Sequence, residues 1–274
     1  YKTIMKNLII SAACGLEPSQ IEFFLKSLRK YYHDDIFFLV GKKDTETKKF
    51  LKIYKCNFLE VDVHKFDIQL KRYSFFLEIL HEKTYKNILF CDSRDVYFQS
   101  NPFDYPYKGS VNYFLEDKKI KDCPYNSSWL IKTYGYKIYN SLSNNIISCG
   151  GTILGNQEGI KKFLSLMIQE ISKHKYKRRL KYVLTFRRDP GGRGSDQSHG
   201  NYIAHNKLIK NSFFYSNEGG PIATAYHLEK IKFNKNYELI NLANEPYAVV
   251  HQYDKRWDRF KDCVGRIKEN LCIK

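Results

Sequence analysis

Residues 7–41 read NLIISAACGLEPSQIEFFLKSLRKYYHDDIFFLVG, and this stretch decides the fold. The apolar run at Asn7–Ala13 is typical of a buried strand, and Ile36–Val40 (IFFLV) is a second run of the same kind. Between them, Pro18–Tyr31 carries apolar residues at positions 21, 24, 25 and 28, which is helical spacing. A strand, a helix and a strand joined this closely predict a βαβ unit with parallel strands.

The same alternation continues up to the middle of the chain. Helices are predicted at Thr45–Tyr54 and Ile68–Glu82, and strands at Phe58–Val63 and Asn87–Cys91. Phe58–Val63 alternates apolar and acidic residues, whereas strands that are apolar along their whole length, such as Ile36–Val40, fit a sheet that is covered on both faces. The predicted class is therefore α/β: an α/β/α sandwich with a mostly parallel central sheet and a Rossmann-like N-terminal half.

The second half of the chain is less regular. Strands are expected at 112–116, 146–155 and 247–251, and helices at 159–174 and 196–207. We find no internal repeat and no low-complexity linker, so we expect one domain over residues 1–274, with its halves at about 1–100 and 101–274.

The composition limits what this protein can be. Its 274 residues are 43% hydrophobic and 16% aromatic, which allows a sizeable core and argues against intrinsic disorder. Lysine and arginine number 46 against 29 acidic residues, and the net charge of +17 favours anionic partners such as phosphates, nucleic acid or acidic lipid. The seven cysteines contain no C-x-x-C spacing, so we expect free thiols in a reducing compartment, the cytoplasm. No apolar run is long enough for a membrane helix, but the chain begins with Tyr1, which leaves open a longer parent protein.

The strongest local motif is LFCDSRDVYF at residues 89–98. It follows a predicted strand, and parallel sheets bind ligands beyond the carboxyl ends of their strands. Asp92 and Asp95 would repel each other unless a cation or hydrogen-bond donors lay between them, and such carboxylates suit Mg²⁺ or Mn²⁺. Arg94 could pair with one carboxylate or with a phosphate. The alternative interpretation is a polar turn with an internal Asp–Arg pair, and the motif alone leaves both open.

A second motif lies near the C-terminus. His251 ends the predicted strand at 247–251, where neutral imidazole would be a third metal ligand. Lys255 follows within reach of a diphosphate. The alternatives are a hydrogen-bonded structural histidine and a solvated lysine.

Two further motifs contain candidate residues. The adjacent Gly150 and Gly151 precede an apolar run and indicate that the backbone closely approaches a ligand or the core. Asp196 and Gln197 open a predicted helix, where an aspartate is also an ordinary N-cap. The chain has no Walker-type phosphate loop, no Rossmann G-x-G-x-x-G fingerprint and no G-x-S-x-G nucleophile elbow.

In this order the motifs resemble those of nucleotide-sugar glycosyltransferases of the GT-A fold, especially polysaccharide transferases of the bacterial and viral type. The family's D-x-D metal motif corresponds to Asp92-Ser93-Arg94-Asp95, and its small-residue strand to Cys149–Gly155. Its Asp-Gln pair corresponds to residues 196–197, and its late histidine with a basic residue to 251 and 255. The likeness covers about residues 7–258. The spacing D-x-x-D departs from the family and leaves open which aspartate is the main ligand.

The resemblance implies a GT-A-like fold whose first half binds the nucleotide and whose second half binds sugar and acceptor. It implies a divalent cation, Mn²⁺ or Mg²⁺, held by Asp92, Asp95 and His251. The residues implied in nucleotide binding are Ser11, Ala12, Ala13, Arg72, Asp92, Ser93 and Lys255. The residues implied at the sugar are Arg94, Gly150, Gly151, Asp196 and Gln197.

The implied reaction moves a sugar from a nucleoside-diphosphate sugar, with UDP the expected nucleotide, to a hydroxyl of a glycan or lipid-linked saccharide. Asp196 and Gln197 are the implied catalytic residues. In an inverting reaction Asp196 would be the general base. In a retaining reaction, which the motifs resemble slightly more, the pair would orient the sugar or stabilise its positive charge. The glycines at 191–194 would belong to a lid over the donor.

Two other classes remain as alternatives. The basic charge and the many aromatic residues also suit a nucleic-acid-binding protein, although the aromatics fall in apolar periodic runs and no nucleic-acid-binding motif is visible, so we expect no nucleic-acid partner. A metal-dependent phosphoesterase or nuclease would need further clustered carboxylates or histidines. The basic run at 175–188 is consistent with peripheral contact with an anionic membrane. The alternative is a solvated face.

Overall fold

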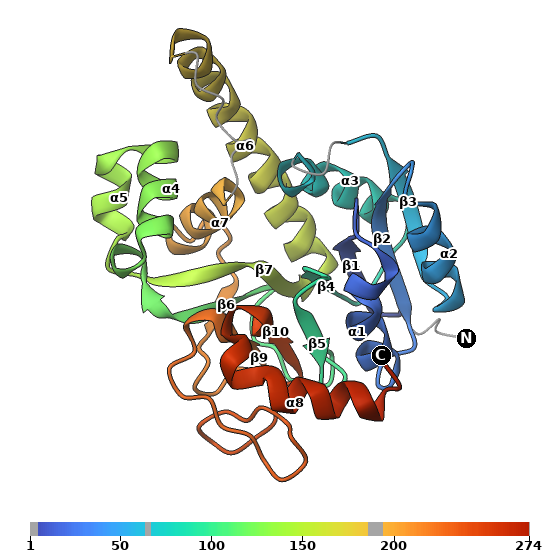
Figure 1. Cartoon of the computed structure of the whole chain (residues 1–274). Helices are drawn as coiled ribbons and strands as arrows, with labels where there is room; N and C mark the ends of the chain where they lie inside the picture. The colour runs from blue at the N-terminus through green and yellow to red at the C-terminus, as the bar shows by residue number, and fades with distance from the viewer. Residues whose placement is uncertain (1–4, 64–66, 186–193, 274) are drawn as a thin grey trace.

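A computed structural model describes residues 5–63, 67–185 and 194–273 of the chain, with side chains described outside 175–185. A seven-stranded sheet in the order β3-β2-β1-β4-β7-β6-β8 runs through the molecule (Figure 1). Its strands are β1 (Leu8–Ala12), β2 (Asp35–Gly41), β3 (Asn57–Val61), β4 (Asn87–Cys91), β6 (Val111–Lys119), β7 (Ile146–Asn156) and β8 (Ser212–Tyr215).

The sheet is mostly parallel, with one reversed strand. β3, β2, β1 and β4 pair in parallel, as do β6 and β8. β7 runs antiparallel to both of its neighbours, β4 and β6. Strands from both halves of the sequence therefore belong to one sheet, and the predicted α/β class with a mostly parallel sheet between helices is confirmed.

Helices cover both faces because alternate side chains of each strand point to opposite sides. Leu8 and Ile10 belong to the core beneath α3 (Ile68–Glu82), α6 (Gln157–Thr185) and α7 (Ser195–His205), whereas Ile9 belongs to the core beneath α1 (Pro18–Arg29) and α2 (Thr45–Ile53). The sequence favours α1 locally, because Pro18 occupies its first turn and Glu17 and Gln20 form a capping box.

A smaller sheet completes the fold. It has the order β5-β10-β9, with β5 (Val96–Phe98), β9 (Ile222–Thr224) and β10 (Val249–His251). β10 pairs antiparallel with β5 and parallel with β9. Phe260 and Val264 of α8 (Trp257–Asn270) pack in the core of this sheet. Because β5 starts directly after the acidic motif, this sheet brings the C-terminal strand to that motif.

A helical hairpin stands beside α7 (Figure 1). It consists of α4 (Pro124–Tyr134) and α5 (Tyr136–Leu142), which are joined at Gly135 with φ +83°, a value that favours glycine. Short 3-10 helices at Ile120–Asp122, Ala225–His227 and Tyr253–Arg256 connect the remaining elements.

The element predictions for the first half are confirmed to within a few residues. In the second half the strand expected at 112–116 extends over Val111–Lys119, and the helix expected at 159–174 extends over Gln157–Thr185. The strand expected at 247–251 covers only Val249–His251. The sequence analysis missed β5, β8, β9, α4, α5 and α8.

Three other predictions can be placed. All seven cysteines are free, as expected. Within the described residues, no helix has both the length and the apolar character needed to cross a bilayer. The side chains of the basic run at 175–188 and residues 190–193 of the predicted lid lie outside the described part of the structure.

Candidate metal centre and its surroundings

Asp92, Asp95 and His251 converge at the carboxyl end of β4. Each offers a ligand atom, and these atoms all lie within 4.8 Å of one another. The Nε2 atom of His251 is 3.6 Å from Oδ1 of Asp95 and 3.7 Å from Oδ2 of Asp92. Two carboxylates and an imidazole are a suitable donor set for a divalent cation such as Mn²⁺ or Mg²⁺. The turn with an internal Asp–Arg pair is not what forms here, because Arg94 pairs instead with Asp254.

The pairing of β5 with β10 explains the convergence. His251 lies opposite Val96 in the register, and Val96 directly follows Asp95. The backbone N–H of Gln252 donates to the Asp95 carbonyl over 2.8 Å, which extends this pairing past the end of β10. Two ligands that are far apart in the sequence are thus fixed by one short strand pair.

Strand β7 makes room for these ligands at Gly151. A Cβ atom on Gly151 would lie 2.3 Å from Cε1 of His251 and 2.6 Å from Oδ2 of Asp92, so only glycine fits at this position of β7. The Gly151 carbonyl also accepts the backbone N–H of Asp92 over 2.9 Å. The close approach predicted from the glycine pair is therefore found at Gly151. At Gly150 a Cβ would make only ordinary contact with Gln197, at 3.4 Å.

Arg72 joins the acidic motif to the start of α7. Its Nη1 donates to Oδ1 of Asp92 over 2.6 Å, and its Nη2 donates to Oδ2 of Asp196 over 3.1 Å. Arg72 is only 7% exposed, and its Nε atom has no hydrogen-bond partner among the described residues. The residue assigned to the nucleotide from sequence is therefore buried between two aspartates.

The charges of this group depend on one another. Burial by itself would raise the pKa of Asp92, but the Arg72 guanidinium and the His251 imidazole hold it well below its usual range. Burial raises the pKa of Asp95 and of Asp196. Burial disfavours the charge on His251, yet Cys149 and the aspartates raise its pKa well above its ordinary value. Arg72 and His251 thus supply the positive charge that keeps Asp92 ionised.

Arg72 itself stays charged. Burial opposes the charge, but Tyr73 and the two aspartates raise the Arg72 pKa above its ordinary value. The guanidinium also lies over the ring of Phe90, with 4.7 Å between Cζ and the ring centroid.

A second set of polar contacts surrounds Gln197. Its Nε2 donates to Oε1 of Glu116 over 3.2 Å and to Oδ1 of Asn126 over 3.1 Å. Glu116 is 2% exposed, and its other oxygen contacts Nδ1 of His227. Gln197 is thus held by Glu116 and Asn126, whereas its neighbour Asp196 is held by Arg72.

The residues predicted at the nucleotide base and ribose lie at the end of β1. The Ser11 hydroxyl donates to the Cys91 carbonyl over 2.7 Å, and the Ser93 hydroxyl donates to the Ala12 carbonyl over 2.8 Å. The Ala13 N–H donates to the Leu39 carbonyl over 2.8 Å. Both hydroxyls therefore connect β1 to the strand end that carries the acidic motif.

Arg94 and Lys255 lie at the more exposed edge of the site. Their side chains are 50% and 43% exposed, and both approach Oδ2 of Asp254, over 3.5 Å and 3.4 Å. The contact that places them is thus with Asp254 and not with the candidate ligands.

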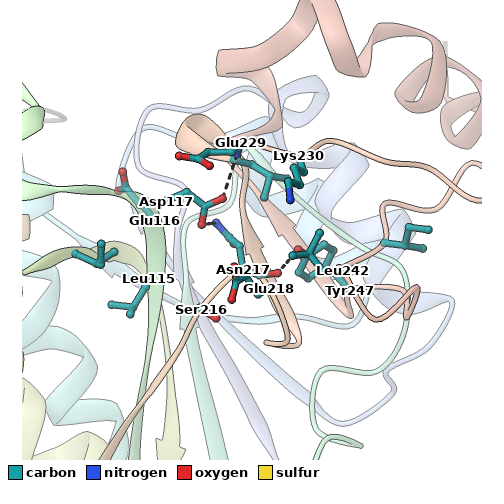
Figure 2. Close-up of a pocket in the computed structure, with 13 residues that line it drawn as sticks. Leu115, Glu116, Asp117, Ser216, Asn217, Glu218, Glu229, Lys230, Leu242 and Tyr247 are labelled. Carbon is teal, nitrogen blue, oxygen red and sulfur yellow. Dashed lines mark hydrogen bonds between the residues drawn. The ribbon is translucent and has the colours of Figure 1, made fainter.

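A pocket includes Glu116, the residue that accepts a hydrogen bond from Gln197, in its lining (Figure 2). It has a volume of about 350 Å³ and lies between the end of β6, the β8–β9 connection and residues 228–247. Its lining includes four carboxylate side chains and one ammonium group, from Glu116, Asp117, Glu218, Glu229 and Lys230. Carboxylates repel phosphates, and none of the three candidate ligands lines this pocket.

Sequence reasoning missed Glu116, Asn126, Cys149 and His227 as contributors to the site. Glu116 lies within a predicted strand, and an acidic residue within such a run was an available signal. Asn126 and His227 lie in elements that were not predicted, so their positions had no visible pattern.

A scan against protein-family models finds no match, and no curated protein is significantly similar in sequence.

Proposed function

We propose that this protein is a glycosyltransferase that moves a sugar from a nucleoside-diphosphate sugar, with UDP as the expected nucleotide, to a hydroxyl of a glycan or lipid-linked saccharide. The observation that carries the proposal is the convergence of Asp92, Asp95 and His251 at the carboxyl end of β4. Sheets of this kind bind ligands at that edge. The motif order that resembles GT-A transferases supports the same reading.

The cation in this proposal has a defined role. Asp92, Asp95 and His251 would hold Mn²⁺ or Mg²⁺, which would supply positive charge against the negative charge that grows on the departing diphosphate. Arg72 keeps Asp92 ionised and fixed in position.

The transfer itself involves the residues at the start of α7. A bond forms between the acceptor oxygen and the anomeric carbon, while the bond from that carbon to the diphosphate oxygen breaks and its electron pair leaves with the diphosphate. The acceptor hydroxyl loses its proton in the same process. Asp196 would take that proton in an inverting reaction. In a retaining reaction the departing diphosphate oxygen would take it, and Asp196 with Gln197 would orient the sugar.

The place of action belongs to the proposal as well. Free cysteines are consistent with the cytoplasm. A lipid-linked acceptor would bring a protein of charge +17 to an anionic membrane surface, where it would bind peripherally.

A thermal-stability screen tests this function. Purified protein is heated with UDP-glucose, UDP-galactose, UDP-N-acetylglucosamine or GDP-mannose, with and without Mn²⁺. A donor at 100 times its dissociation constant adds about 2.7 kcal/mol to the free energy of unfolding, and we expect this gain only when Mn²⁺ is present.

Two results would contradict the proposal. One is the absence of stabilisation by any nucleotide or nucleotide sugar. The other is tight DNA binding that weakens steeply with salt, which would favour a nucleic-acid-binding protein.

A further inference from the structure

The imidazole of His251 has different neighbours on its two nitrogens. Nε2 faces the carboxylates of Asp92 and Asp95, whereas Nδ1 lies 3.3 Å from Sγ of Cys149. His251 and Cys149 are each 1% exposed, so bulk water does not compete for Nδ1. The thiol is therefore the hydrogen-bonding partner of the ring on the side away from the candidate ion.

A histidine that binds a metal through Nε2 must carry its proton on Nδ1. That proton needs an acceptor, and the acceptor fixes both the tautomer and the orientation of the ring. Metal-binding histidines mostly use a carboxylate, a carbonyl or water for this purpose. Here the atom within reach is the Cys149 sulfur, which is a weak acceptor and also a weak donor.

With a cation on Nε2, the proton on Nδ1 would donate to Sγ. The contact between Nδ1 and Sγ already holds the ring in the orientation that such binding needs.

The same strand controls the space around the ring. Cys149 and Gly151 both lie on β7, and a Cβ on Gly151 would collide with Cε1 of His251. β7 thus leaves space beside Cε1 of the imidazole, at Gly151, and places the Cys149 sulfur beside Nδ1. Cys149 is not one of the candidate ligands, which are Asp92, Asp95 and His251.

We propose that Cys149 is a positioning residue for the metal centre: its sulfur hydrogen-bonds Nδ1 of His251 and so holds Nε2 ready to bind a divalent cation. The inference rests on the metal centre of the proposed function, but it is independent of the nature of the donor. It goes beyond that function in making the affinity for the cation depend on a side chain that is not a ligand.

The first experiment measures Mn²⁺ affinity without any nucleotide, by the loss of the electron paramagnetic resonance signal of free Mn²⁺. Cys149→Ala removes the partner of Nδ1, and we expect an affinity weaker by about 10-fold to 100-fold, the usual effect of losing such a partner. Cys149→Ser keeps a group that both donates and accepts, so it should recover most of the affinity. Cys56→Ala is the matched control: Cys56 is another buried free cysteine, its Sγ lies 3.6 Å from the Tyr54 carbonyl, and the variant should bind Mn²⁺ like the wild type.

A second measurement on the wild type covers the case in which Cys149→Ala fails to fold. Nitrogen-15 NMR of the histidine rings reports which nitrogen of His251 carries a proton, with His251→Gln used to assign the signal. We expect protonation at Nδ1 after Mg²⁺ is added, with an Nδ1 shift that differs between the wild type and Cys149→Ser because the acceptor atom differs. Protonation only at Nε2 in the presence of Mg²⁺ would overturn the inference.

The remaining outcomes are also decisive. A folded Cys149→Ala variant with unchanged Mn²⁺ affinity overturns the role of Cys149, even if donor binding is intact. Absence of Mn²⁺ binding by the wild type overturns the metal centre and this inference together. Normal Mn²⁺ behaviour with no nucleotide-sugar binding overturns the proposed function and leaves the role of Cys149 in place.

Discussion

Arg72 and Asp196 form a buried ion pair of 3.1 Å although 124 positions separate them in the sequence. The same guanidinium donates to Asp92 over 2.6 Å. One side chain from α3 thereby fixes the distance between the acidic motif and the start of α7, the two places from which the proposed reaction draws its residues.

We expect Arg72→Ala to lower the free energy of unfolding by about 3 kcal/mol. Removing one partner of a buried ion pair leaves uncompensated buried charge, which costs about 3–5 kcal/mol. The low end applies because the Asp92 side chain is 36% exposed. Urea denaturation measures the change.

Lys71→Ala is the control for Arg72, because Lys71 is the preceding helical residue and its exposed side chain pairs only loosely with Asp67. It should change stability by less than about 0.5 kcal/mol. An Arg72→Ala variant with unchanged stability and lost donor binding would show that Arg72 acts on the ligand and not on the fold.

Asp95→Asn should abolish the Mn²⁺-dependent part of any thermal stabilisation and leave the metal-free melting curve nearly unchanged. The amide keeps the shape of the carboxylate but is a poor ligand for Mn²⁺. Asp62→Asn is a suitable control, because the Asp62 side chain is 85% exposed. Full Mn²⁺-dependent stabilisation of Asp95→Asn would remove Asp95 from the ligand set.

Gly151→Ala should weaken Mn²⁺ binding and destabilise the fold by about 1–3 kcal/mol, the usual cost of overpacking. The added methyl would lie 2.3 Å from His251, so the ring or β7 has to move. Calorimetric titration with Mn²⁺ and thermal melting measure the two effects.

Gly265→Ala provides the comparison for Gly151. Gly265 lies within α8, and a Cβ there meets nothing within 4 Å. Its replacement should stabilise the protein by about 0.5–1 kcal/mol through helix propensity. If Gly151→Ala stabilised the protein as Gly265→Ala does, the close approach of β7 to His251 would be refuted.

The stability of the protein should depend on His205 below neutral pH. Burial lowers the pKa of His205, and its Nε2 lies 2.9 Å from the Ile146 carbonyl. The unfolded chain then binds more protons than the folded one as the pH falls below the ordinary histidine pKa of about 6.5, so this contribution is present above that pH and is lost below it. The free energy of unfolding, measured between pH 5 and 8, should fall more steeply toward acid in the wild type than in His205→Gln.

The exposed His81 is the comparison for that measurement. Identical profiles for the wild type and His205→Gln would show that His205 does not carry this dependence.

Local sequence patterns were enough for the first half of the fold. β1, β2 and β4 are mainly short apolar runs, β3 alternates apolar and acidic residues, and α1 to α3 show helical spacing or helix-start residues, so the signal lies within a few neighbouring positions. The pattern of α8 was also available: Phe260, Cys263 and Val264 are buried at helical spacing. Its many charged residues concealed it.

The second half gave weaker signals for a physical reason. β8 and β9 are four and three residues long, which is too short for a period to be recognised. α4 and α5 bury few residues, and the core they share with Ile120 and Ile147 is small. Such elements are stabilised by tertiary contacts more than by their own sequence pattern.

The sequence by itself determined that a parallel βαβ half exists and that Asp92 and Asp95 follow a strand, because strand and helix periods and strand ends are properties of adjacent residues. Only the tertiary structure decided that His251 joins those aspartates, that Arg72 lies between Asp92 and Asp196, and that Cys149 faces the far side of the imidazole. These contacts depend on which strands pair in the two sheets and in what register. The pairing and the register are determined by the burial of side chains throughout the molecule.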